Sequence, residues 1–119
     1  MRRLTHQKNG RNCAIGRICY SGVDGATAPD GILIYIKPAC YGNEPRDIYE
    51  YFKTSKTFPH ESTKDQFFSE SQFESYRMLG AYTMEKLCRG CGGDFGCFIR
   101  DILTTHLEIK VPKWLGKLI

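Results

Sequence analysis

Two segments in the first third of the chain have the hydrophobic pattern of β-strands. Residues 14–20 alternate in character, so that Gly16, Ile18 and Tyr20 share one side. Residues 32–36 are apolar throughout and precede Pro38, which cannot continue a strand ladder. The sequence between them, SGVDGATAPDG, is rich in glycine and contains two Asp-Gly pairs, which favour a turn. The pattern predicts an antiparallel β-hairpin.

Helical patterns begin after this hairpin. Asn43 is suited to cap a helix that carries carboxylates in its first turn and the apolar side chains of Ile48, Tyr51 and Phe52 on one face. Beyond Phe58, either Ser62 or Thr63 can cap a further helical segment, with Asp65 or Gln66 completing a capping box. In this reading Phe58 packs onto Phe67 or Phe68 at the helix entry.

A longer helix is predicted from a second capping box, formed by Ser69 and Gln72. One stripe of this helix carries Phe73, Tyr76, Leu79 or Gly80, and Leu87, so the helix is expected to end near Leu87 with Phe73 in the core. After the glycine-rich RGCGGDFG, we expect a helix over 98–106 and a short strand over 107–111.

These elements together predict an α+β fold, in which an antiparallel hairpin or small sheet packs against three to four helices. The chain has 119 residues, which suits one domain with its own core. Residues 1–12 are basic and are expected to form a frayed N-terminal arm.

The net charge of +4 is concentrated at the two ends of the chain, while the middle is acidic. We interpret Arg2, Arg3, Lys8 and Arg11 as a solvated terminus and do not expect nucleic-acid binding. No apolar run is long enough for a signal sequence or a membrane span, so a cytoplasmic protein with reduced thiols at its six cysteines is expected.

The C-terminal residues mix lysines with Trp114 and aliphatic side chains. This composition allows peripheral contact with an anionic membrane surface. We favour the alternative, in which Trp114 folds onto the core and closes the end of the domain.

The second strand is apolar on both of its faces, which one layer of helices cannot cover. Leu33 and Tyr35 form one face, and the isoleucines between 32 and 36 form the other. Pairing of hairpin edges across a two-fold axis would supply more cover. The sequence therefore predicts a homodimer through the hairpin edge, with a different protein as the other partner to consider.

The cysteines between 88 and 97 suggest metal or thiol chemistry. Cys88 and Cys91 have the spacing of a zinc knuckle, and Cys97 follows. A fourth ligand would come from His106, Cys40 or His60, and no second C-x-x-C is present. We favour the interpretation in which these cysteines serve as small apolar residues and bind no zinc or other cofactor. A redox pair is disfavoured because Cys88 and Cys91 follow a helix end.

A second cluster of polar residues consists of His60, Glu61 and Asp65. These residue types can serve as acid, base or metal ligand, but the H-E-x-x-H pattern of a metalloprotease is absent. We therefore interpret them as residues that order a helix entry, and keep binding at this cluster as the alternative.

Several short motifs of the sequence resemble, in order and spacing, a segment that follows the catalytic domain in bacterial patatin-like phospholipase family proteins. They are GILIYIKP, GNEPRDIYEY, FPHESTKDQFF and QFESYRMLG, and they lie within residues 14–80. The chain departs from the family pattern at Tyr41 and Asn43, where the family has threonine and aspartate, and at Ser69, where it has an acidic residue.

The resemblance does not extend to the catalytic motifs of the family. Hydrolysis by that family requires a G-x-S-x-G nucleophile, which this chain lacks, so Asp24-Gly25-Ala26 alone is not a site and is interpreted as a turn. The resemblance implies a non-catalytic accessory or protein-interaction domain. The alternative is a small metal-dependent or thiol-based module that uses Cys88, Cys91 and Cys97, or His60, Glu61 and Asp65.

Overall fold

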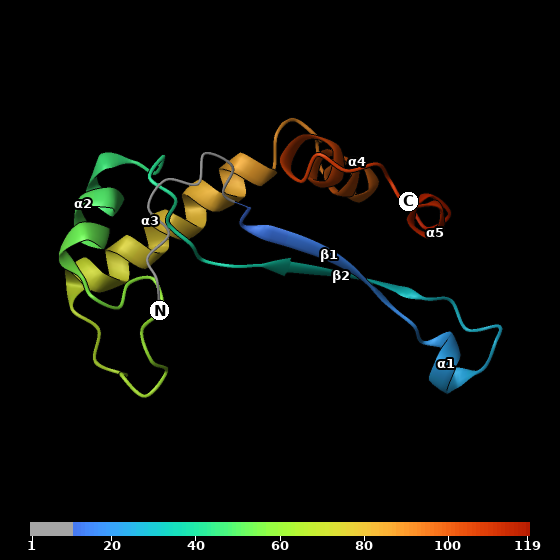
Figure 1. Ribbon diagram of the computed structural model, residues 1–119, viewed down its shortest axis with the longest axis horizontal. Helices are drawn as coiled ribbons and strands as arrows, with labels where there is room; N and C mark the ends of the chain where they lie inside the picture. Colours follow the sequence, from blue (N-terminus) through green and yellow to red (C-terminus); the bar gives the residue numbers. More distant parts are fainter. Residues whose placement is uncertain (1–10) are drawn as a thin grey trace. The chain divides into compact units, whose positions relative to one another are not determined.

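The computed structural model describes residues 11–119, which divide into two compact units. One unit contains Pro38–Cys88 together with Arg11 and Asn12, and the other contains Cys13–Lys37 and Arg89–Ile119. Within the described residues the protein has an α+β fold, with one two-stranded antiparallel sheet and several helices (Figure 1). Whether both units unfold together as the single domain expected for 1–119 stays a prediction.

The hairpin belongs to the unit with the C-terminal helices. Strands β1 (Cys13–Ile18) and β2 (Gly31–Ile36) pair in antiparallel register, with Gly16 opposite Leu33 and Ala14 opposite Tyr35. The predicted hairpin is confirmed, and its turn region contains a short helix, α1 (Ser21–Asp24), that ends at Gly25 with φ 103°. Glycine is favoured there because side chains clash in this left-handed conformation.

The helices of this unit form a separate core beside the hairpin. Helix α4 (Phe95–Asp101) continues into the π-helix η1 (Ile102–His106), and α5 (Lys113–Gly116) follows. The helix predicted over 98–106 is confirmed but begins earlier, because the Asp94 side chain caps α4 by accepting a hydrogen bond from the Cys97 amide. The fully buried side chains are Ile99, Ile102, Leu103 and Leu115.

The strand predicted over 107–111 is absent from the described structure. The backbone of Leu107 and Ile109 instead bonds to the preceding turns, with amides donating to Ile102 and Leu103 carbonyls at 2.8 and 2.9 Å. The chain then turns into α5, where Trp114 is half-buried and Leu115 is buried. Among the described helices, none is both long and apolar enough to cross a bilayer.

The other unit is a pair of helices, α2 (Arg46–Thr54) and α3 (Glu70–Leu87), closed by Phe58. Phe58 is 2% exposed, and its ring packs edge-on against Tyr51 and Tyr76, with centroid distances of 5.0 and 4.9 Å. Ile48 and Leu79 complete this core. The expected packing of Phe58 onto Phe67 or Phe68 is therefore wrong.

Helix α3 begins at the capping box that the sequence predicts. Ser69 accepts a hydrogen bond from the Gln72 amide, and the Gln72 side chain accepts one from the Ser69 amide. The predicted capping box and the end at Leu87 are confirmed. The helical segment predicted from Ser62 or Thr63 does not form, because Ser62 and Asp65 bond to nearby amides in turns instead.

The buried face of α3 differs from the predicted stripe. Phe73 is 62% exposed, whereas Gln72, Leu79, Thr83 and Leu87 are buried. The stripe that faces α2 passes through Tyr76, and Phe73 lies off it. The prediction of Phe73 in the core is therefore wrong, because helix α2 selects which side of α3 is covered.

Helix α2 begins later than predicted, after Pro45 rather than at Asn43. The carboxylate of Glu44 accepts hydrogen bonds from the Tyr41 and Gly42 amides at 2.5 and 2.7 Å. Glu44 is thereby buried in the loop before the helix. Its role is to hold this loop rather than to complement the helix dipole.

The first two described residues are anchored to this unit. Asn12 is buried and its side chain donates to the Ala39 carbonyl at 3.2 Å, while the Arg11 carbonyl accepts from the Tyr41 hydroxyl at 2.9 Å. The predicted frayed arm is therefore wrong for these two residues. Its other positions, 1–10, lie outside the described residues.

Candidate functional site

The polar cluster at the α3 entry does not assemble as a site. Glu61 accepts a hydrogen bond from the Tyr76 hydroxyl, and Asp65 accepts one from the Phe67 amide at 3.2 Å. The His60 side chain is exposed. Within residues 11–119, these three residues do not form a group of converging metal ligands. Glu61 and Asp65 instead fix the loop that leads into α3.

Asp24 lies at the exposed end of α1, and its amide donates to the Tyr20 carbonyl at 2.8 Å. Gly25 follows with a backbone conformation suited to a turn. Asp24 therefore ends a short helix, and the expected turn begins after it, at Gly25 and Ala26.

The structure pairs two of the three cysteines between residues 88 and 97 and leaves the third apart from them. Cys91 and Cys97 form a disulfide with 5.6 Å between their Cα atoms, so the expectation of six reduced thiols is wrong for this pair. Cys88 is free and exposed at the end of α3. His106 is half-buried at the end of η1, and it does not converge with the two cysteines.

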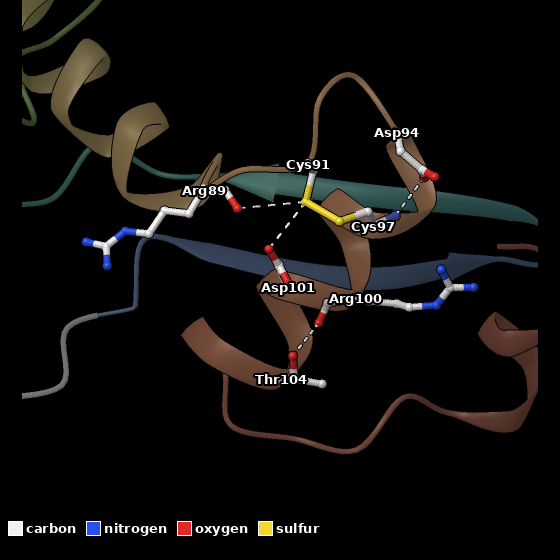
Figure 2. Close-up of a disulfide and its surroundings, with 7 residues drawn as sticks. All are labelled: Arg89, Cys91, Asp94, Cys97, Arg100, Asp101 and Thr104. Carbon is white, nitrogen blue, oxygen red and sulfur yellow. Dashed lines mark hydrogen bonds between the residues drawn. A yellow bond between two sulfur atoms is a disulfide. The ribbon is translucent and has the colours of Figure 1, made fainter.

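An aspartate that the sequence did not indicate lies against the disulfide. Asp101 Oδ2 is 3.3 Å from Cys91 Sγ (Figure 2). In the part of the chain that the structure describes, Cys91, Cys97 and Asp101 are the residues whose potential ligand atoms come within 4.8 Å of one another. The four-residue spacing of Cys97 and Asp101 could have indicated this, since such residues share one helix face.

Two other cysteines are partly or fully shielded from water: Cys13 is buried and Cys40 is half-buried. Burial, together with the nearby charge of Glu44, raises the pKa of the Cys40 thiol to about 12. Burial also raises the pKa of Cys13. Burial therefore disfavours the thiolate form of both side chains. Among the described residues, Cys40 also does not converge with Cys91 and Cys97.

An open cleft of about 360 Å³ lies between the loop end of the hairpin and α5, lined by Arg17, Asp30, Trp114, Lys117 and Leu118. Arg17 Nε donates to Asp30 Oδ2 at 2.7 Å, and its guanidinium carbon lies 5.7 Å from the centroid of the Trp114 ring. Asp30 also accepts from the Ser21 amide and hydroxyl at 3.2 and 2.9 Å. The contact of Arg17 with Trp114 links α5 to the hairpin. The choice between a terminal closure and contact with a membrane surface stays a prediction.

This cleft gives the protein a specific acid sensitivity. Hydrogen bonds from Ser21 and Arg17 hold the pKa of Asp30 below its usual value. A lowered folded-state pKa stabilises the fold above the unfolded pKa of about 3.9, and this stabilisation is lost as the pH falls through the folded value. Salt should weaken the effect because Arg17 is largely exposed.

We therefore expect Asp30→Asn to lower the urea midpoint at pH 7 and to lower it less at pH 3, because the stabilisation by the carboxylate declines below the unfolded pKa of about 3.9. Asp24→Asn, an exposed substitution in the same loop, is the matched control and should change stability by less than about 0.5 kcal/mol. Urea titrations of the three proteins at both pH values measure this. If Asp30→Asn lowered the urea midpoint equally at pH 7 and pH 3, that result would contradict the stabilising role given to the Asp30 carboxylate.

The remaining feature is an exposed apolar face on the hairpin. Leu33 and Tyr35 are 51% and 57% exposed, and their cross-strand neighbours Gly16 and Ala14 are small. Tyr20 continues this face, with its ring against Gly31, where a side chain would approach it to 2.7 Å. The sequence predicted two apolar faces on β2, and within residues 11–119 this one stays largely exposed.

Comparison of the chain with protein-family models, with curated proteins and with solved structures gave no match.

Proposed function

We propose that the protein is a non-catalytic interaction module whose hairpin docks a second copy of the same chain. The observation that carries the proposal is the exposed face made by Leu33, Tyr35, Ala14 and Gly16. Large apolar side chains on one strand lie directly beside small residues on the other. A hairpin with one uncovered apolar face gains stability when a second layer covers it.

The face carries large side chains on one strand and small ones on the other. Leu33 and Tyr35 lie on β2, and Gly16 and Ala14 stand opposite them on β1. A two-fold axis parallel to the strands would set the large side chains of each copy over the small residues of the other, with Leu33 over Gly16 and Tyr35 over Ala14. This self-complementarity favours a second copy over an unrelated partner.

The size of the face sets the expected strength of the dimer. Six residues in each strand give a surface about 20 Å long and about 10 Å wide, or about 200 Å². Stable interfaces bury about 800 Å² on each partner. The face is therefore the apolar centre of a weak, concentration-dependent dimer, to which flanking residues such as Tyr20 contribute. Edge pairing of the same hairpin is the other geometry by which the two copies can meet.

Two further parts of the proposal rest on the sequence. An accessory role beside a bacterial patatin-like lipid hydrolase is supported by the resemblance of residues 14–80, and a hydrolase gene next to this one would strengthen it. A cytoplasmic location is the second part, carried over from the expectation given in the sequence analysis.

The dimer is tested by sedimentation velocity over a range of concentrations. The wild type should associate in the micromolar range, and Leu33→Lys with Tyr35→Lys should shift the dissociation constant at least about tenfold, because two charges would be placed in an apolar contact. Val23→Lys is the matched control, since Val23 is 87% exposed in α1 and lies outside the two strands. A wild type that stays monomeric, or a control variant that weakens association equally, would contradict the proposal.

A further inference from the structure

The loop before α4 holds Cys91 in place without help from the disulfide. The Cys91 carbonyl accepts a hydrogen bond from the Asp94 amide at 2.9 Å, and the Asp94 side chain accepts one from the Cys97 amide at 2.9 Å. Gly92 and Gly93 have φ values of 55° and 88°, which let the chain reverse tightly here. Reduction of the disulfide therefore leaves both sulfur atoms close together.

Asp101 completes the group from the next turn of the helix. Cys97 and Asp101 are four residues apart, so they share a face of α4, and the Asp101 carboxylate lies against Cys91 Sγ (Figure 2). The three side chains are partly exposed, which leaves the group open to solutes. Their donor set, two sulfurs and one carboxylate oxygen within 4.8 Å, matches a borderline-soft divalent cation such as Zn²⁺.

We propose that Cys91, Cys97 and Asp101 form a redox-gated metal site, which binds one Zn²⁺ when the disulfide is reduced and releases it when the disulfide forms. A dithiol supplies two electrons and two protons to the S–S bond and becomes a disulfide itself, leaving two thiols on the protein. Zn²⁺ then displaces the two thiol protons and binds both thiolates and the carboxylate. Three protein ligands leave the fourth tetrahedral position to water.

Metal binding and the disulfide exclude each other because Zn²⁺ binds cysteine as the thiolate, and the neutral sulfurs of a disulfide are poor ligands. Thiols are kept reduced in the cytosol, where disulfides are mostly transient or redox-sensing. In the cytoplasmic location proposed above, the site would hold metal under reducing conditions. It would lose the metal when a small-molecule disulfide takes two electrons from the two thiolates, which re-forms the Cys91–Cys97 bond and, with two protons, converts the small-molecule disulfide into two thiols. This site is independent of the hairpin face and of the dimer.

The ligand set differs from the one that the sequence suggested. Cys88 and Cys91 have the familiar knuckle spacing, but the structure brings Cys97 and Asp101 to Cys91. Cys88→Ser and Asp101→Asn therefore separate the two alternatives. Asp101→Asn keeps the size of the side chain and both cysteines, so it tests the ligand without removing the disulfide.

The experiment is a Co²⁺ titration of the full chain, followed by the near-ultraviolet thiolate-to-cobalt absorption, with a phosphine reductant present or absent. The reduced protein should bind one Co²⁺, displaced by one Zn²⁺, and the oxidised protein should bind none. Cys97→Ser should lose the absorption, and Asp101→Asn should weaken binding at least about tenfold. Cys88→Ser should bind as the wild type does.

Three results would overturn the proposal. They are stoichiometric binding by the oxidised protein, no thiolate-to-cobalt absorption on reduction, and a loss in Cys88→Ser with none in Asp101→Asn. Circular dichroism of each variant distinguishes the loss of a ligand from the loss of the fold.

Discussion

Replacing Phe58 with alanine is expected to cost about 3–5 kcal/mol of unfolding free energy, as for other large aromatic deletions in a core. Phe58 is 2% exposed, and its ring packs against Tyr51 and Tyr76 between α2 and α3. Phe73→Ala is the matched control and should change stability by about 0.5 kcal/mol or less, because Phe73 is 62% exposed. Urea denaturation followed by far-ultraviolet circular dichroism measures both. A larger loss in Phe73→Ala would reverse the assignment of the buried face of α3.

The same variant tests whether the two units form one domain. The chain has one tryptophan, Trp114, which belongs to the other unit. If the units unfold together, Phe58→Ala should lower the urea midpoint seen by Trp114 fluorescence as much as that seen by circular dichroism. A tryptophan midpoint that stays at the wild-type value would show two independent units and contradict the single-domain prediction.

The second large effect is expected at the C-terminal helix, where Leu115→Ala should cost about 2–5 kcal/mol. Leu115 is 0% exposed although α5 has only four residues, so the helix must be held by packing rather than by its own hydrogen bonds. Leu118 is 42% exposed and serves as the control, with Leu118→Ala expected to cost much less. Equal losses in thermal or urea denaturation would mean that α5 is not the buried closure of this unit.

The sequence predicted those elements whose signals are local. The hairpin follows from alternation and Asp-Gly turns, and the start of α3 follows from Ser69 and Gln72, which need only each other. The predicted segment after Ser62 failed because serine and aspartate side chains also bond to turn amides, and the same residues then serve a loop.

The buried face of α3 could not be assigned from the sequence. Phe73 and Tyr76 are three residues apart, and an apolar stripe can be drawn through both. The choice depends on Phe58, which enters from outside the helix and takes Tyr76 as its neighbour. Exposed Phe67 and Phe73 show that aromatic residues do not by themselves mark a core.

The candidate sites were predicted only in part. Cys91 and Cys97 were identified by residue type, but the reversal at Gly92 and Gly93 decides which cysteines meet, and Asp101 was missed. Arg17 and Asp30 lie 13 residues apart in sequence, and Asp30 was interpreted as a turn residue only. Pairs formed across a loop of this length leave no periodic signal along the chain.

The docking of a second copy through the hairpin is tested most directly by isotope-filtered NOE spectroscopy on a mixture of labelled and unlabelled protein. The wild type should show contacts between the Tyr35 ring of one copy and the Ala14 methyl of the other, and between Leu33 methyls and Gly16, at concentrations where sedimentation shows association. Filtering removes the contacts that these cross-strand neighbours make within one copy. An associated sample with no intermolecular contact at these four residues, or a chain that does not associate, would contradict the account.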